Sequence, residues 1–400
     1  RKKEEEAGRK ISDWTAASVQ KLVYQGGDKV TLAMEKKGEG WVMTQPAGAL
    51  VDTRAVANLL SILEALYERK AADSPGDLAA FGLDKPNAVL TVNGEGEKTL
   101  TLKAGTSSPA SGHRYVQIGE KGPVVMVASD KAGNLMQDSK ALRNRSLFAQ
   151  MDIGKVKKVE LQRPDYAMSF AKGGEEKWRL QTPVADRAHP QRFSSWLEML
   201  LMANATGFKA ATPPAKPDWQ IILNGGEAEG QKVVLWKDKE DILASRQGEP
   251  DAMVLPKYLA KDLDKSGLEM VDLRVLEGGS LSRLQATWQG KTIGVEKKEN
   301  NWPLPAWNSV EESLTRDGVE AMMGVGEPAS VELVLEAAAG DGKWQIKGWK
   351  EGKDMVLAVP DRPVRIRLST LQTEALEKSL QVVFAPPEEK KADKGVVEQK

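Results

Sequence analysis

The chain has 400 residues, of which 40% are hydrophobic and 28% charged, and its 57 Lys and Arg residues balance its 57 Asp and Glu residues. This length exceeds one typical hydrophobic core, and it predicts roughly two to four domains of ordinary globular composition. The formal net charge of zero argues against a nucleic-acid-binding protein, because phosphate neutralisation supplies most of the affinity of such proteins.

The scarcity of cysteine and histidine further limits the kinds of catalytic and metal-binding site that the chain can form. The sequence has no Cys and two His, which argues against disulfides, thiolate or zinc sites, a Cys nucleophile and a Ser-His-Asp triad. No apolar run approaches the roughly 18 residues that a membrane-spanning helix needs. We therefore predict no catalytic, cofactor-binding or metal-binding residues and no cofactor, and we expect a protein that is not an enzyme.

The chain begins with a charged segment, residues 1–11, whose first ten residues read "RKKEEEAGRK", and it has no initiator Met. We interpret this segment as a juxtamembrane linker whose preceding membrane anchor or signal is absent from the sequence. The last segment, residues 386–400, is equally charged and poor in apolar residues, so we predict that it is disordered.

The first folded stretch, residues 12–150, carries an alternating hairpin pattern that ends at Trp41. Pro46 then predicts a turn, and Asp52 is a suitable N-cap for the helix that follows. The helix is predicted from an apolar stripe at i, i+3, i+4, i+7 and i+10, formed by Val56, Leu59, Leu60, Leu63 and Leu66.

The same pattern returns without a gap 137 positions later, within residues 151–277. Trp178 matches Trp41, and Pro183 matches Pro46. A second apolar stripe follows His189, which we expect to cap a helix or face solvent. The recurrence predicts a second copy of one structural unit.

A weaker third copy is predicted at residues 278–385, beginning at a joint formed by Gly278 and Gly279. Trp302 and Pro305 take the places of the Trp and Pro of the earlier copies. Val319, Met322 and Met323 are assigned to its helix, although Gly318 interrupts the pattern. Each copy is then followed by Pro and a further strand pattern.

These patterns predict an α+β fold of three tandem repeats. Each repeat is an antiparallel β-sheet, with a hairpin, a Trp strand and a Pro turn, packed against one amphipathic helix. The recurrence of Trp41, Trp178 and Trp302 favours a core role for all three. Three other tryptophans, Trp307, Trp344 and Trp349, fall outside the repeat pattern, and we predict them as the candidate ligand patch.

The succession of "GWVMTQPAGALVDTRAVANLLSILEAL", "FGLDKPNAVLTV", "LTLKAG", "RYVQIG" and "LRNRSLF" resembles the bacterial family called domain of unknown function 4340. Phe81 stands where that family usually has Tyr, and Asn144 stands where it usually has Asp. The resemblance covers about residues 1–150 well, 151–277 moderately and 278–385 weakly.

The resemblance implies a periplasmic or extracytoplasmic protein that is anchored to the inner membrane by one N-terminal helix. It also implies an ABC-type permease, an ATPase and an auxiliary subunit as partners, because the genes of such proteins often neighbour one another. We therefore expect a non-catalytic accessory or binding subunit of an ABC-type transport system. The alternatives are a stand-alone periplasmic module that binds or scaffolds envelope glycan, lipid or protein, and a hydrolase acting on an envelope polymer.

Overall fold

The computed structural model describes residues 9–11, 13–26, 29–68, 70–71, 77–109, 112–135, 139–149, 151–225, 230–277, 280–324, 328, 330–360 and 362–385. The predicted tail, the joint at residues 278–279 and residues 1–8 of the predicted linker lie outside this part of the chain. Within the described ranges, the chain forms two compact units, one from residues 9–156 with 198–263 and one from residues 157–197 with 264–385.

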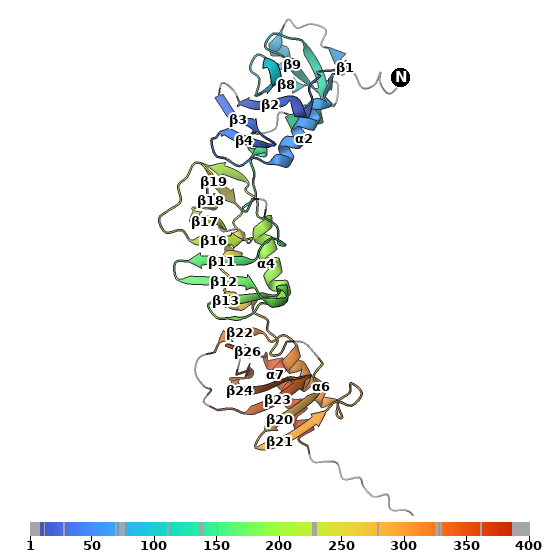
Figure 1. Ribbon diagram of the computed structural model, residues 1–400, viewed down its shortest axis with the longest axis vertical. Coiled ribbons are helices and arrows are strands. Elements are labelled where there is room, and N and C mark those ends of the chain that lie inside the picture. Colours follow the sequence, from blue (N-terminus) through green and yellow to red (C-terminus); the bar gives the residue numbers. More distant parts are fainter. Residues whose placement is uncertain are drawn as a thin grey trace, which may run out of the picture. The chain divides into compact units, whose positions relative to one another are not determined.

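The described strands form three large sheets, and Figure 1 shows helices alongside each sheet. This arrangement confirms the predicted α+β class. No helix in the described ranges is long and apolar enough to cross a membrane.

The first sheet has the strand order β4-β3-β2-β7-β8-β9-β10-β6. Its strands are β2 (Val19–Gly26), β3 (Lys29–Lys37), β4 (Gly40–Gln45), β6 (Lys70–Ala71), β7 (Ala88–Gly94), β8 (Thr99–Ser107), β9 (His113–Ile118) and β10 (Val124–Ala128). The helices of this region are α2 (Thr53–Glu64) and α3 (Ser129–Leu135), and a separate small pair joins β1 (Arg9–Lys10) to β5 (Tyr67–Glu68).

The second sheet has the order β14-β13-β12-β11-β16-β17-β18-β19-β15. The second unit holds β11 (Lys158–Arg163), β12 (Tyr166–Lys172), β13 (Trp178–Thr182) and β14 (Asp186–Arg187), and the first unit holds β15 (Gly207–Lys209), β16 (Trp219–Asn224), β17 (Gln231–Asp238), β18 (Asp241–Arg246) and β19 (Ala252–Leu255). Its helices are α4 (Pro190–Met202) and α5 (Leu259–Leu263).

The third sheet has the order β21-β20-β23-β24-β25-β26-β22. Its strands are β20 (Arg283–Trp288), β21 (Lys291–Glu296), β22 (Glu320–Met323), β23 (Leu333–Ala339), β24 (Gly342–Glu351), β25 (Asp354–Ala358) and β26 (Val364–Arg367). Two helices, α6 (Ala306–Thr315) and α7 (Thr370–Val383), pack against each other beside it.

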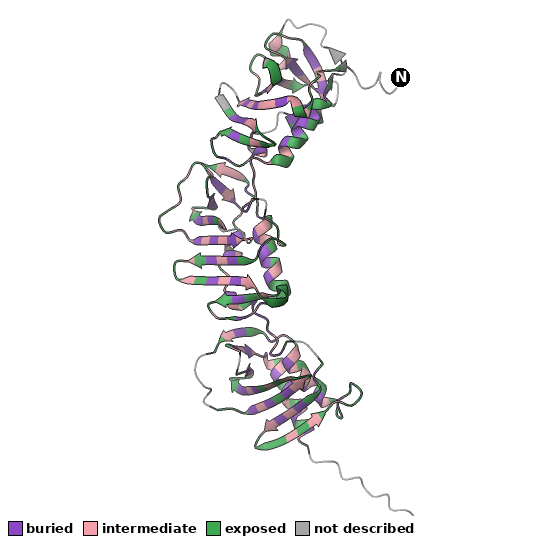
Figure 2. Ribbon diagram, in the orientation of Figure 1, coloured by how far each residue is buried: buried purple, intermediate pink, exposed green. Residues whose placement is uncertain are grey.

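Helix α2 forms as its sequence predicts. The carboxylate of Asp52 accepts hydrogen bonds from the backbone N–H groups of Arg54 and Ala55, both at 3.0 Å, so Asp52 is the N-cap. The buried side chains of the helix belong to one hydrophobic cluster with strand residues of the first sheet. Figure 2 shows the alternation of buried and exposed residues along the helix. The buried side chains are those of Val56, Leu59, Leu60, Ile62 and Leu63. Burial of this stripe fixes the helix on the first sheet.

The helix of the third region lies earlier in the chain than the sequence predicts. Helix α6 begins at Ala306, so Met322 and Met323 fall in β22 rather than in a helix. Gly318 lies outside the helix as well. A Cβ atom on Gly318 would stand 2.6 Å from the carbonyl oxygen of Arg367, so glycine permits a close backbone approach there.

Candidate functional site

The most elaborate polar structure of the first unit is built around the connecting segment at residues 142–147, which we call the first connector. On one side, Asp52 N–H donates to Leu142 and Asn144 N–H donates to Leu50. On the other side, Leu147 N–H donates to Ala203, and Ala205 N–H donates to Arg145. The first connector therefore lies between the start of α2 and the end of α4, with backbone hydrogen bonds to both.

A buried arginine of β18 holds this first connector in place. The guanidinium of Arg246 donates to the carbonyl oxygens of Asn144 at 2.9 Å and Ser146 at 2.7 Å, and to the Asn144 side chain at 2.8 Å. Arg246 also pairs with Glu249 at 2.7 Å. Burial lowers the pKa of the Arg246 guanidinium, and the charge of Glu249 opposes this effect.

Arg143 completes this first cluster. Its guanidinium pairs with Glu249 and with Asp251, the latter at 2.8 Å, and lies 3.7 Å from the centroid of the Phe208 ring. The Glu249 side chain is fully buried between the two arginines. A buried carboxylate shared by two guanidinium groups is compensated in charge and hydrogen bonding, which burial of an ion requires.

The second unit contains a corresponding arrangement at residues 270–276, which we call the second connector. His189 N–H donates to Met270 at 2.7 Å and Asp272 N–H donates to Arg187 at 2.9 Å. On the other side, Gly318 N–H donates to Leu273 at 3.0 Å. The second connector therefore lies between the start of α4 and the end of α6, as the first lies between α2 and α4.

Arg362, from the segment between β25 and β26, holds the second connector. Its Nε donates to both carboxylate oxygens of Asp186 at 3.1 Å, and its terminal nitrogens donate to the carbonyl oxygens of Arg274 and Asp272. Arg187 donates to the same Arg274 carbonyl at 2.9 Å. In both units, then, a buried arginine near the last strands of one sheet binds carbonyl groups of the connector.

A groove of about 640 Å³ opens beside this second cluster. Trp178, which is half-buried and packs on Phe193 with ring centroids 4.7 Å apart, lies along it. Arg179 and Arg187 face each other across the β13–β14 pair and also line it. The acidic lining residues are Glu175, Glu176, Asp272 and Glu277. The groove thus combines an aromatic ring with mixed charges, a combination suited to polar ligands.

The predicted repeat residues are placed as follows in the first two sheets. Trp41 lies on β4 and packs, half-buried, against the core of the first sheet. Trp178 lies at the equivalent position on β13. Pro46 and Pro183 each follow the Trp-bearing strand and are preceded by cis peptide bonds.

The third region departs from this pattern. Trp302 is buried and donates from its indole nitrogen to Glu311 at 2.7 Å, but it lies in no strand. Pro305 is the N-cap of α6 instead of following a strand as Pro46 and Pro183 do. The reason is length: Trp41 precedes its helix cap Asp52 by eleven residues, whereas Trp302 precedes Pro305 by three, which leaves no chain for a strand and turn.

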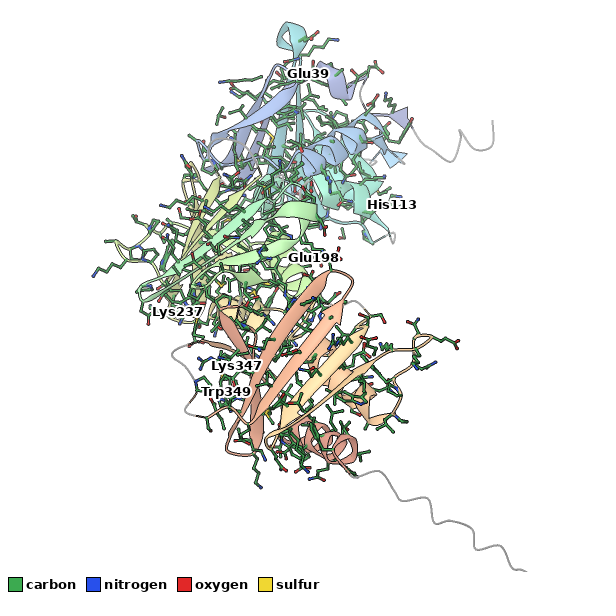
Figure 3. All side chains as sticks on the ribbon, turned by 60° about the horizontal axis from the view of Figure 1, so that its bottom comes forward. Glu39, His113, Glu198, Lys237, Lys347 and Trp349 are labelled. Carbon is green, nitrogen blue, oxygen red and sulfur yellow. The ribbon has the colours of Figure 1, made fainter. Side chains whose placement is uncertain are left out.

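The three residues of the predicted ligand patch do not share one surface. Trp307 is completely buried on α6. Trp344 and Trp349 both lie on β24, but an odd separation places them on opposite faces of the sheet. Trp349 is 7% exposed, donates to Glu351 at 3.2 Å and lies under the guanidinium of Arg365. Figure 3 labels Trp349 beside Lys347 of the same strand.

His189 caps α4. Its Nδ1 accepts a hydrogen bond from Arg192 N–H at 3.3 Å, and its Nε2 lies 3.3 Å from Asp317. This placement confirms the expectation that His189 caps a helix. In the described ranges, no group of three or more His, Cys, Asp or Glu side chains is arranged to hold a metal ion.

Sequence reasoning missed the buried arginines Arg246 and Arg362 and their partners. Arg246 and Asn144 are 102 positions apart, and Arg362 and Asp186 are 176 apart. No local periodicity marks such pairs. For Arg246, the available signal was an Arg at the end of a partly apolar strand, "DILASR" of β18.

The fold therefore defines an α+β protein of antiparallel sheets with helices beside each sheet and arginine-held connectors between them. Residues 41–219 match the model of the family described as "Domain of unknown function (DUF4340)", which confirms the resemblance over these residues. No curated protein and no solved structure matches the chain.

Proposed function

We propose that the chain is a non-catalytic accessory or binding subunit of an ABC-type transport system in the bacterial envelope. In this proposal it is extracytoplasmic and anchored to the inner membrane, and it contacts a permease, an ATPase or an auxiliary subunit. The observation that carries the proposal is that buried, charged arginine side chains hold the two connectors. The guanidinium groups of Arg246 and Arg362 bind connector carbonyls and carboxylates, which suits a scaffold that presents several sheets.

We further propose that the three sheets are tandem repeats of one unit. The support is the common strand order, in which a hairpin precedes the helix and a short strand after the helix pairs with the last strand of each sheet. The two connectors add to this support because their hydrogen bonds run to equivalent points of successive helices. A tandem scaffold of this kind offers a repeated surface to partners.

Co-purification from membranes tests the transport proposal. A tagged full-length protein is expressed in its own host, cross-linked in membranes, and its partners are identified by mass spectrometry. The wild type is expected to recover a permease or ATPase, and Arg246→Met is expected to recover less because the first connector loosens. Arg316→Ala, which alters an exposed pair with Glu312, serves as the matched control. A full-length protein that is soluble, or that never recovers a permease or ATPase, contradicts the proposal.

The groove beside Trp178 favours a second candidate, a stand-alone module that binds an envelope glycan. An indole face and mixed charged groups are the usual means of holding a sugar ring and its hydroxyls. Titration with soluble peptidoglycan fragments, followed by tryptophan fluorescence, tests it. Binding should be lost in Trp178→Ala and kept in Trp344→Ala; equal binding by the two variants excludes this groove.

A further inference from the structure

Among the described residues, the third sheet has no counterpart of a strand that the other two sheets possess. In the first sheet β4 pairs with β3, with Met43 opposite Met34, and in the second sheet β13 pairs with β12, with Leu180 opposite Phe170. In the third sheet β21 occupies the corresponding position of β3 and β12, but it is the outermost strand (Figure 1). Beyond β21 the described chain makes only one isolated bridge, between Lys298 and Asn301.

The outer edge of β21 presents backbone groups to solvent. Lys297 N–H donates to the Ser282 carbonyl, and every second residue of an antiparallel strand faces the same neighbour. The N–H and C=O groups of Thr292, Gly294 and Glu296 therefore point away from β20. Figure 2 shows that β21 is largely exposed, and these three residues are among its exposed ones. An open row of this kind is a template for strand pairing.

A groove of about 620 Å³ lies against this edge. It is lined by the edge residues Gly294, Val295 and Glu296, by Arg283 of β20, and by the loop around Trp302. Val295 and Ile293 are half-buried and lie on the same face of the sheet as the buried Leu284 and Ala286. An added strand would place its own apolar side chains next to them on this face, as β4 places Met43 opposite Met34 of β3.

The charges around the edge are mostly positive. Lys291 lies at one end of β21, and Arg283 and Lys298 lie at the other. Among the described residues none of these three cations has an ion-pair partner, and Glu296 is the one carboxylate on the strand. An occupant with an apolar centre and acidic ends would satisfy both the apolar face and the unpaired cations.

We propose that β21 is a docking edge for an extended segment of a partner protein, with an apolar centre and acidic flanks, which adds to the third sheet as its missing strand. Main-chain hydrogen bonds to Thr292, Gly294 and Glu296 give the affinity, and the cations select the acidic flanks. The chain's own β4 and β13 indicate the kind of segment that fits. This inference holds whether or not the partner belongs to a transporter.

A labelled probe peptide tests the proposal by fluorescence anisotropy. The probe is Asp-Asp-Val-Met-Thr-Gln-Asp-Asp, whose centre copies residues 42–45 of β4, and the control peptide has Lys in place of each Asp. The purified full chain is expected to bind the acidic probe and to bind the Lys-flanked peptide at least about tenfold more weakly. Failure of the acidic probe to bind at all overturns the proposal.

Two substitutions at one glycine locate the binding edge. Gly294→Pro removes an outward N–H on an edge strand, where proline is tolerated. This variant is expected to bind the acidic probe about tenfold or more weakly than the wild type does. Gly294→Ala keeps the N–H, and its Cβ meets only the flexible Gln285 side chain at 3.3 Å, so it is expected to bind as the wild type does. Equal binding by the proline variant and the wild type overturns the proposal.

Two further measurements cover a Gly294→Pro variant that does not fold and pairing of the chain with a second copy of itself. If Gly294→Pro does not fold, Lys298→Glu replaces it. This exposed loop substitution should weaken binding of the acidic probe and strengthen binding of the Lys-flanked peptide. Sedimentation of the wild type checks for self-pairing. A concentration-dependent dimer that disappears in Gly294→Pro would assign the edge to a second copy of the chain and overturn the assignment to a partner protein.

Discussion

Arg362 donates from Nε to both carboxylate oxygens of Asp186, at 3.1 Å each, although the two residues stand 176 positions apart. Both side chains are almost fully removed from solvent, at 9% and 2% exposure. A charge pair at this depth is held by its mutual compensation, so loss of one member leaves the other unpaired in a poorly solvated place.

The first prediction concerns this pair. Arg362→Met should lower the free energy of unfolding by about 3–5 kcal/mol, because Asp186 loses its guanidinium partner and the carbonyl groups of the second connector lose one of their donors. Denaturant titration followed by tryptophan fluorescence measures the change. Arg316→Met, which breaks an exposed pair, should cost less than about 1 kcal/mol. Equal costs for the two variants would contradict a structural role for Arg362.

The second prediction is a pH dependence at Asp272. Burial acts to raise the pKa of this carboxyl group, but hydrogen bonds from Arg274 and the charges of Arg187 and Arg274 outweigh burial, and the net pKa is lowered. Between the lowered pKa and the usual one, the unfolded chain binds more protons than the folded chain. The stabilisation is therefore complete above about pH 5 and is lost as pH falls through the lowered pKa.

The comparison of wild type with Asp272→Asn over the pH range 2–8 measures this contribution. The difference in unfolding free energy should be about 1–3 kcal/mol near neutral pH, as for hydrogen bonds to charged groups. It should shrink towards zero under acid conditions. A difference that stays constant down to about pH 2 would mean that the Asp272 charge contributes nothing.

The third prediction concerns Tyr24 in the first sheet. Its hydroxyl donates to the Leu135 carbonyl at 2.8 Å, and burial strongly raises its pKa. Because the folded pKa is raised, its stabilising contribution is present below the usual tyrosine pKa of about 10 and is lost only as pH rises towards the folded value. In an ultraviolet titration, one of the five tyrosines should ionise only when the protein unfolds.

Replacement of Tyr24 gives an independent measurement. Tyr24→Phe should cost about 1–3 kcal/mol, because the buried Leu135 carbonyl loses its partner. The ultraviolet titration of this variant should also lack the delayed phase, which is the ionisation that occurs only when the protein unfolds. If the delayed phase survives, it belongs to another tyrosine.

The fourth prediction compares two tryptophans. Trp307→Ala should lower the unfolding free energy by about 3–5 kcal/mol, since Trp307 is completely buried on α6. Trp41→Ala should cost less, because Trp41 is half-buried and packs at the margin of the first core. Thermal or denaturant unfolding of both variants ranks the two effects. A larger loss in Trp41→Ala would reverse the assignment of core and margin.

Several local features were predictable because neighbouring residues determine them. Asp52 was identified as an N-cap from its position before an apolar stripe, and the stripe itself follows from the helical period. The same reasoning failed at Met322 and Met323, which lie in β22. There the repeat pattern was extended across a deletion, and the short path from Trp302 to Pro305 moved the helix towards the N-terminus.

The amino-acid sequence by itself determined the α+β class, the helix caps and stripes, and the recurrence of Trp and Pro before two helices, since all of these depend on residues close together in the chain. Only the tertiary structure decided that Arg246 and Arg362 hold the connectors and that Trp307 is core, because these outcomes depend on residues about 100 positions apart or more and on which face is buried. The open edge of β21 is likewise a feature that only the tertiary structure decided. A missing strand becomes visible when the sheet that it would have completed is assembled.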